Sequence, residues 1–270
     1  MDKTRKHLFH ILKESPWPLF MAFGVLFLVS GLTFYMHNIK NGYMLFFFGI
    51  FIITFVSYKW VIDILDEATF SGDHSIAVQM GITSGFLLFI VSEIMLFFGF
   101  FWAFFHSSIC PSILLGAEFP PVGITIIPVF MFPLYNTCLL LLSGVTVTWL
   151  HKAINLGLYK DAIDSFFLTI FLGLAFFVLQ MFEYYESPFS FYNSIYGCTF
   201  FMLTGLHGFH VFVGIVCLFL SFLRLIKNHF TTKHHNGLIF AIWYWHFVDV
   251  VWIFLFLTVY CWGNNIFILT

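Results

Sequence analysis

The sequence predicts an all-α membrane protein with seven transmembrane helices. Of its 270 residues, 61% are hydrophobic and only 9% are charged, and the mean hydropathy is +0.97. Soluble domains carry about 25% charged residues. A chain of this composition cannot cover a water-facing surface with polar side chains, so the bilayer must be its solvent. The net charge of -2 argues against nucleic acid as a partner.

Seven apolar stretches are long enough to cross the hydrocarbon core, which takes about 20 residues. They cover residues 17–36, 42–62, 76–106, 131–151, 162–183, 196–223 and 238–262. We expect an N-terminal segment at residues 1–14 and one membrane domain at 15–270. Within that domain, helices 1 and 2 are expected at residues 15–62 and helices 3–7 at 76–263.

The basic residues predict the orientation of these helices. If the N-terminus and every second loop share one side of the membrane, that side receives ten of the eleven Lys and Arg residues, and only Lys40 falls opposite. Such an asymmetry places the N-terminus on the cytosol-equivalent side and the C-terminus across the membrane.

Glu93 is a carboxylate near the middle of the third stretch, in FIVSEIMLFFGFFWAFFHSS. A central charge costs at least about 2.5–3.5 kcal/mol, so this side chain should face protein or water. His106, thirteen residues later, falls on nearly the opposite face of the helix, so any partner must come from another helix. A protonated or hydrogen-bonded packing role and a proton-linked functional role both stay open.

Asp249 is a second deep carboxylate, in WYWHFVDVVW of the seventh stretch. His246 lies three residues earlier on the same helical face, so we expect a His–Asp hydrogen bond that satisfies both groups.

His207 and His210, in TGLHGFHVFVG, share a face of the sixth stretch. Two ligands are too few for zinc, which takes three or four from a protein, so packed histidines hydrogen-bonded to a neighbouring helix are expected and a metal site is not. The five cysteines also lack the close spacing of a thiolate metal site. No stretch carries two histidines 13–14 residues apart, which argues against a membrane cytochrome with two stacked haems.

Further motifs follow one another in an order that resembles subunit III of cytochrome c oxidase. The resemblance covers nearly the whole chain and rests on SPWPL (15–19), SGLT (30–33), ATFSGDHSIAVQMG (68–81), SEIMLFFGFFWAFFHSS (92–108), LLLSGVTVTWLH (140–151), EYYESPF (183–189), YGCTFFMLTGLHGFHVFVG (196–214), HHNG (234–237) and WYWHFVDVVWIFLF (243–256).

The resemblance implies a seven-helix subunit whose first two helices splay from the other five, so that a V-shaped cleft holds phospholipids. It implies no cofactor bound by this chain, because the family's haem and copper lie in partner subunits I and II. In the family, the glutamate matching Glu93 faces subunit I, and the subunit is associated with fast proton uptake and a durable oxidase. The implied partners also include accessory subunits. The implied location is the mitochondrial inner membrane, with the N-terminus in the matrix and the C-terminus in the intermembrane space.

Lipid-headgroup positions carry over residue by residue: Trp60, Glu67 and His74 match the cleft, and Arg224, Lys227 and His229 match a second lipid seat. The residues of RLIKNHFTTKHH are equally typical of an ordinary positive-inside loop. Arginines usual in the family are replaced by Ile62, Asp66 and Thr83. The loss of three cations weakens the case for an anionic lipid at that end of the cleft. A zwitterionic lipid, or a cation from a neighbouring subunit, would fit better.

We therefore expect a non-redox subunit of a mitochondrial haem–copper oxidase, with no catalytic centre of its own, that supports subunit I, binds lipid and maintains proton uptake. The alternative is an autonomous proton-coupled transporter that uses Glu93, Asp249 and His246 as a relay. Against it, the sequence lacks the internal repeats and Gly/Pro-broken helix pairs that build midplane substrate sites.

Overall fold

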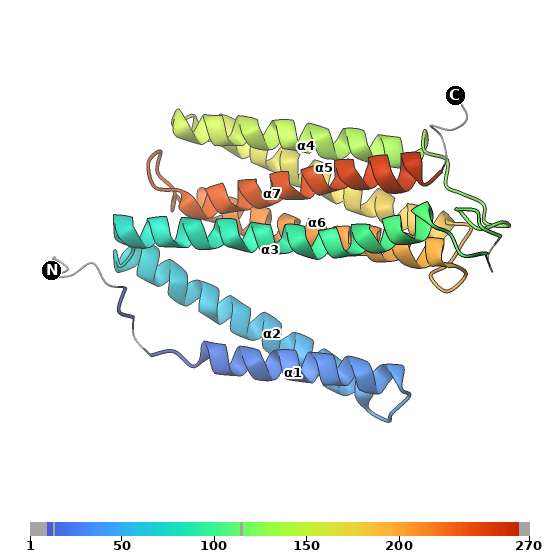
Figure 1. Cartoon of the computed structure of the whole chain (residues 1–270). Coiled ribbons are helices and arrows are strands. Elements are labelled where there is room, and N and C mark those ends of the chain that lie inside the picture. Colours follow the sequence, from blue (N-terminus) through green and yellow to red (C-terminus); the bar gives the residue numbers. More distant parts are fainter. Residues whose placement is uncertain (1–9, 13, 114–115, 265–270) are drawn as a thin grey trace. The chain divides into compact units, whose positions relative to one another are not determined.

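The computed structural model describes residues 10–12, 14–113 and 116–264. Within them the chain forms helices and connecting loops but no strand, and seven helices are long and apolar enough to cross a membrane. These are α1 (Trp17–Met36), α2 (Gly42–Leu65), α3 (Ile76–Ile109), α4 (Phe132–Asn155), α5 (Tyr159–Glu186), α6 (Ile195–Ile226) and α7 (Asn236–Leu255) (Figure 1). The predicted fold class is confirmed.

Two helices run on beyond their α-helical part as short π-helical segments. α2 continues into η1 (Asp66–Phe70), and α7 continues into η3 (Phe256–Trp262). The second span therefore extends to Phe70, whereas the apolar pattern predicts an end at residue 62. The added turns carry Asp63, Asp66 and Glu67, so the hydrophobic pattern stops there although the backbone continues to coil.

The chain divides into two compact units, residues 1–82 and 83–270. The first holds α1, α2, η1 and the beginning of α3, and the second holds the rest. The predicted splaying of the first two helices stays a prediction.

In the first unit, α1 and α2 form a hairpin whose contact is made by glycines. The buried residues are Gly24 and Gly31 in α1, and Gly42, Gly49 and Val56 in α2, spaced seven residues apart within each helix. A methyl group added at Gly49 would lie 2.5 Å from the backbone nitrogen of Leu28. Small residues let two membrane helices approach to backbone contact, where dispersion replaces the hydrophobic effect.

A polar contact fixes the other end of this hairpin. The indole N–H of Trp17, in the first turn of α1, donates to the carboxylate of Asp63 near the end of α2. The hydrogen bond satisfies a carboxylate that the apolar helix would otherwise present alone, and it joins the beginning of α1 to the end of α2.

In the second unit, α4 packs on α5 and α7, and α6 also packs on α5 and α7, so the four helices form a closed ring. Trp245 of α7 is fully buried within it. Its indole N–H donates to Ser143 Oγ of α4 over 2.9 Å. Its ring lies against Gly173 of α5 and Gly214 of α6, where an added methyl group would come within 2.7 and 2.9 Å.

The indole of Trp252 repeats this arrangement two turns later in α7. Its N–H donates to Thr137 Oγ1 of α4 over 3.0 Å, and its ring packs edge-on against Phe176 of α5 at 4.8 Å. Both indoles are thus satisfied by hydroxyl groups of α4, as a buried Trp requires in a medium without water.

α3 joins this ring through aromatic side chains. Phe86 stacks on Phe240 with ring centroids 4.7 Å apart, and Phe89 stacks on Tyr244 at 6.2 Å. Such pairs fill the wider spacing between helices that are not in backbone contact. Glu93, one turn beyond Phe89 in α3, is brought to the same side.

We predict that Gly49→Leu disrupts the α1–α2 hairpin, because the new side chain must displace the backbone of Leu28. Overpacking of this kind typically costs about 1–3 kcal/mol, occasionally more. The free energy of unfolding in mixed micelles, followed by loss of helical circular dichroism, measures it. Gly81→Leu is the matched control, since a Cβ added there meets nothing within 4 Å. Equal stability of the two variants would contradict the glycine contact.

Candidate functional site

The partner of Glu93 is His210 of α6. Glu93 Oε2 lies 2.8 Å from His210 Nε2, and the two side chains are 20% and 6% exposed. The interhelical partner expected from the sequence is therefore present, and it belongs to this chain. Phe97, one turn further along α3, covers the imidazole with its ring centroid 5.0 Å away.

The hydrogen bonds of His210 determine how many protons the pair holds. Its Nδ1 lies 2.8 Å from the backbone carbonyl of Leu206, which can only accept, so Nδ1 carries a hydrogen. Nε2 then either accepts from a protonated Glu93 or donates to an ionised one. Both arrangements keep one proton in the 2.8 Å contact, and both leave the pair neutral overall, as a membrane interior favours.

His207 makes the helix-to-helix hydrogen bond that the sequence predicts. It is 1% exposed, and its Nε2–H donates to the backbone carbonyl of Val248 in α7 over 3.2 Å. The ring also packs against Trp252 with centroids 5.1 Å apart. Because His207 and His210 direct their Nε2 atoms to different partners, they act as separate packing groups.

Asp249 does not form the hydrogen bond predicted with His246. The nearest approach is 3.9 Å, between His246 Nδ1 and Asp249 Oδ2, which is too long for a hydrogen bond. The carboxylate turns instead toward α4, where Oδ2 would lie 2.5 Å from a methyl group at Gly144. Among the described residues, Oδ1 has no hydrogen-bond partner. The i−3 spacing brings the two residues to one face, but the space left by Gly144 sets the rotamer.

Glu183 of α5 is a deep carboxylate that the sequence analysis missed. It is 2% exposed. Its Oε1 accepts from Tyr260 in η3 over 2.5 Å and from the side-chain amide of Gln180 over 3.4 Å. Gln180 in turn accepts from Asn136 of α4 over 3.5 Å. The available signal was a Gln and a Glu at i, i+3 in QMFEYYE, opposite an Asn at the beginning of the fourth span.

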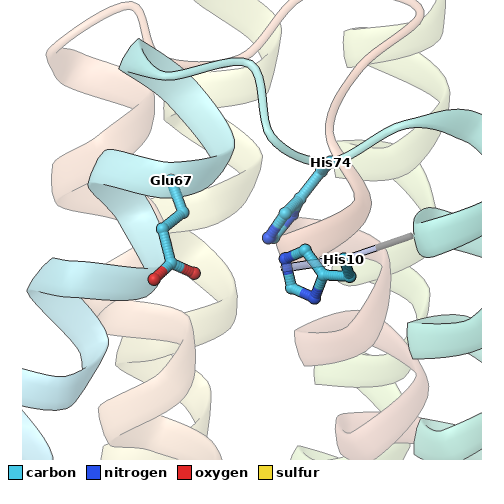
Figure 2. A group of neighbouring side chains, drawn as sticks. All are labelled: His10, Glu67 and His74. Carbon is cyan, nitrogen blue, oxygen red and sulfur yellow. The ribbon is translucent and has the colours of Figure 1, made fainter. Parts of the chain in front are cut away.

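Two predicted lipid positions of the first unit lie together with a residue that the sequence analysis did not select. Ligating atoms of His10, Glu67 and His74 all lie within 4.8 Å of one another. Figure 2 shows the two imidazole rings side by side and the Glu67 carboxylate turned toward them. Trp60, the third predicted cleft position, lies two turns before Glu67 in α2 and is half-buried.

The second predicted lipid position surrounds the end of α6. Arg224 is half-buried, with its guanidinium 4.5 Å above the ring of Phe230, and its carbonyl accepts from the backbone N–H of His229 over 3.0 Å. Lys227 is exposed and His229 is half-buried. A pocket of about 350 Å³ lies beside them, lined by residues of α4, α5, α6 and the following loop that include Phe230.

α3 and α7 also enclose an apolar pocket of about 840 Å³. Its lining consists mainly of phenylalanine, isoleucine, valine and tryptophan side chains, with His246 and Thr258 as the polar residues. Its size and composition suit hydrocarbon chains better than a polar substrate.

We predict that Glu93→Gln keeps the α3–α6 hydrogen bond, because the amide N–H can donate to His210 Nε2, and changes the free energy of unfolding by less than about 1 kcal/mol. His210→Leu should cost about 1–3 kcal/mol, since the Glu93 carboxyl loses its partner. Unfolding in mixed micelles measures both. His246→Leu is the control, since no hydrogen bond is lost there. If Glu93→Gln costs as much as His210→Leu, the pair is not the one described.

Comparison with known proteins gives a consistent result along the whole chain. Residues 7–264 match the family model described as cytochrome c oxidase subunit III. A protein named cytochrome c oxidase subunit 3 from Pisaster ochraceus is 49% identical over 261 residues, which are 97% of this chain and 100% of that protein. Proteins of the same name from Anopheles gambiae and Marchantia polymorpha are 48% and 46% identical, and each alignment covers 98% of this chain and 100% of the relative. The chain belongs to the cytochrome c oxidase subunit III family.

Proposed function

We propose that this chain is the non-redox third subunit of a mitochondrial cytochrome c oxidase, the complex that reduces dioxygen with electrons from cytochrome c and pumps protons. The observation that carries the proposal is near full-length similarity, at 46–49% identity, to relatives that bear the subunit's name. The chain would lie in the inner membrane as a multi-pass protein beside subunits I and II and accessory subunits. It would supply no catalytic centre.

The state of the buried histidines supports a structural role. His207 donates to a backbone carbonyl, and both ring nitrogens of His210 are engaged, one by Leu206 and one by Glu93. These imidazoles are used to hold α6 against α3 and α7. Haem and copper would therefore be held by the partner subunits.

The predicted orientation follows from the loops of the observed helices. If the helices cross the membrane in alternating directions, the N-terminal segment and the loops after η1, α4 and α6 would share one side, and these segments with their adjoining helix ends carry ten of the eleven basic residues. The positive-inside rule would place this side in the matrix. The C-terminus would then face the intermembrane space.

Phospholipids are the proposed ligands of the chain. Arg224, Lys227 and His229 supply cationic or hydrogen-bonding groups at the end of α6, next to the 350 Å³ pocket. The apolar pocket between α3 and α7 offers room for acyl chains. Trp60, Glu67 and His74 would contact a headgroup at the other seat, where an acidic surrounding favours a zwitterionic lipid over an anionic one.

The deciding experiment is purification of the chain from its native membranes in mild detergent. We predict that haem absorbance co-migrates with it, and that mass spectrometry finds phospholipids in the same particle. A colourless, monodisperse chain that carries out counterflow would instead establish the autonomous transporter. Haem that stays with the isolated chain after dissociation of all partners would establish a membrane cytochrome. Either result would overturn the proposal.

The structure does not favour the transporter's relay. Glu93 is bonded to His210 of α6, whereas Asp249 lies against Gly144 of α4. Among the described residues, no hydrogen bond joins Glu93, Asp249 and His246 into a chain along which a proton could pass.

Glu93 is the residue through which the chain would affect proton uptake, because it shares a proton with His210 in the middle of the third span. We predict that Glu93→Gln leaves assembly and haem spectra unchanged and slows proton uptake during turnover, measured by stopped-flow pH indicators in proteoliposomes. The amide keeps the hydrogen bond but cannot release the proton. His246→Gln, which lies outside the Glu93–His210 pair, serves as the control. Loss of haem signals in Glu93→Gln would show a purely structural role.

A further inference from the structure

The N-terminal segment, η1 and the loop before α3 bring together two imidazoles and one carboxylate. His10 comes from the residues before α1, Glu67 from η1 and His74 from the loop that leads into α3, all within the first unit. Their ligating atoms lie within 4.8 Å of one another. Figure 2 shows that the three side chains point to one place from three different segments.

Backbone hydrogen bonds hold the two residues that flank the turn. The N–H of Ser71 donates to the carbonyl of Asp66 over 2.8 Å, and the N–H of Asp73 donates to the carbonyl of Glu67 over 2.9 Å. The side-chain amide of Gln79 donates to the carbonyl of His74 over 2.9 Å. Glu67 and His74 are therefore presented by a closed turn. The cost of ordering them for a ligand is already met by folding.

The ring of His10 is the third component. It lies edge-on to the ring of His74, with centroids 5.3 Å apart and an interplanar angle of 76°. His10 is exposed, whereas Glu67 and His74 are half-buried. The site is thus open to water on the side of His10, which gives an ion a path of entry.

The connection that supplies Glu67 and His74 is acidic. The segment from Asp63 to His74 carries four carboxylates and no Lys or Arg, whereas Lys3, Arg5, Lys6 and Lys13 all belong to the N-terminal segment that supplies His10. Asp63 is already bonded to Trp17. An anionic ligand would meet these carboxylates without a lysine or arginine from this stretch of sequence to balance them.

Two imidazole nitrogens and one carboxylate oxygen form the ligand set of many zinc sites with an open fourth position. Ligand atoms bound to zinc at about 2.0–2.2 Å stand closer together than 4.8 Å, so the three side chains would have to rotate slightly toward the ion. Magnesium and calcium prefer oxygen ligands throughout, so the two imidazoles select against them.

We propose that His10, Glu67 and His74 form a binding site for Zn²⁺. The ion joins the residues before α1 to the connection between α2 and α3, next to the Trp17–Asp63 contact. Water, or a phosphate oxygen of the lipid headgroup proposed above at Glu67 and His74, completes its coordination, so the ion lies between the chain and that headgroup. The site is distinct from the Glu93–His210 pair and does not depend on whether the chain belongs to an oxidase complex.

Zinc binding to the full-length chain tests the proposal. The chain is purified in mild detergent with the partners it retains, stripped with a chelator and titrated with Zn²⁺, and the ions bound per chain are counted by atomic emission. Wild type should bind one ion more than His10→Ala, or bind that ion at least about 10–100-fold more tightly. Glu67→Gln should weaken binding of this ion similarly. X-ray absorption at the zinc edge should show two imidazole ligands on the ion that wild type binds and His10→Ala loses.

The control variant is His37→Ala, which removes an exposed histidine from the loop between α1 and α2, away from the cluster. It should bind zinc as wild type does. Because His10 lies before the first helix and is exposed, its replacement should leave the fold intact, and circular dichroism checks this. If wild type, His10→Ala and Glu67→Gln bind zinc equally, or if the zinc edge shows no imidazole, the site does not exist. Neither outcome requires haem or turnover.

Discussion

The position of Trp245 is the constraint on which the second unit depends. One indole contacts all the other helices of the ring: its N–H donates to Ser143 of α4, and its ring fills the space left by Gly173 and Gly214. A rotation of α7 by one residue would remove this hydrogen bond and drive the indole into neighbouring backbone. The register of α7 is thereby fixed. With it are fixed Val248 as the acceptor for His207, and Gly144 as the neighbour of Asp249.

The polar groups inside this unit follow one rule, which is that charge is kept low by sharing protons. The Glu93–His210 pair is neutral in either arrangement of its proton, and Glu183 receives hydrogen bonds from Tyr260 and Gln180. In hydrocarbon an unsatisfied polar group costs several kcal/mol, so each carboxylate is bound to a neighbouring helix or turned toward one. Asp249 departs most from this rule: among the described residues its Oδ1 lacks a partner, and its Oδ2 lies 3.9 Å from His246 Nδ1, too far for a hydrogen bond. It is the carboxylate for which a water or a partner chain would matter most.

The sequence predicts the spans well because hydrophobicity and length are local properties, and α1 begins and ends at the predicted residues 17 and 36. It also predicts that Glu93 needs an interhelical partner, since its own helix offers none. It does not select His210 over other histidines, because that choice depends on how α3 and α6 meet. His10 and Glu67 are far apart in the chain, so no spacing rule joins them. The error at His246 and Asp249 arose because helical periodicity gives a face but not a rotamer.

The glycine contact of α1 and α2 has a consequence for how this hairpin can vary. Because two backbones meet directly, the buried residues of α1 and α2 are four glycines and Val56, and many large side chains of both helices are exposed. The pair can close as soon as both helices have entered the membrane, before the later helices are made. Its outer surface can then tolerate substitutions that suit the lipids and proteins around it, whereas a side chain at Gly31 or Gly49 would collide with the backbone of the other helix. Selection on the outer side chains of this hairpin would therefore depend on the lipids and proteins they contact. Selection at the α1–α2 contact would depend only on side-chain size.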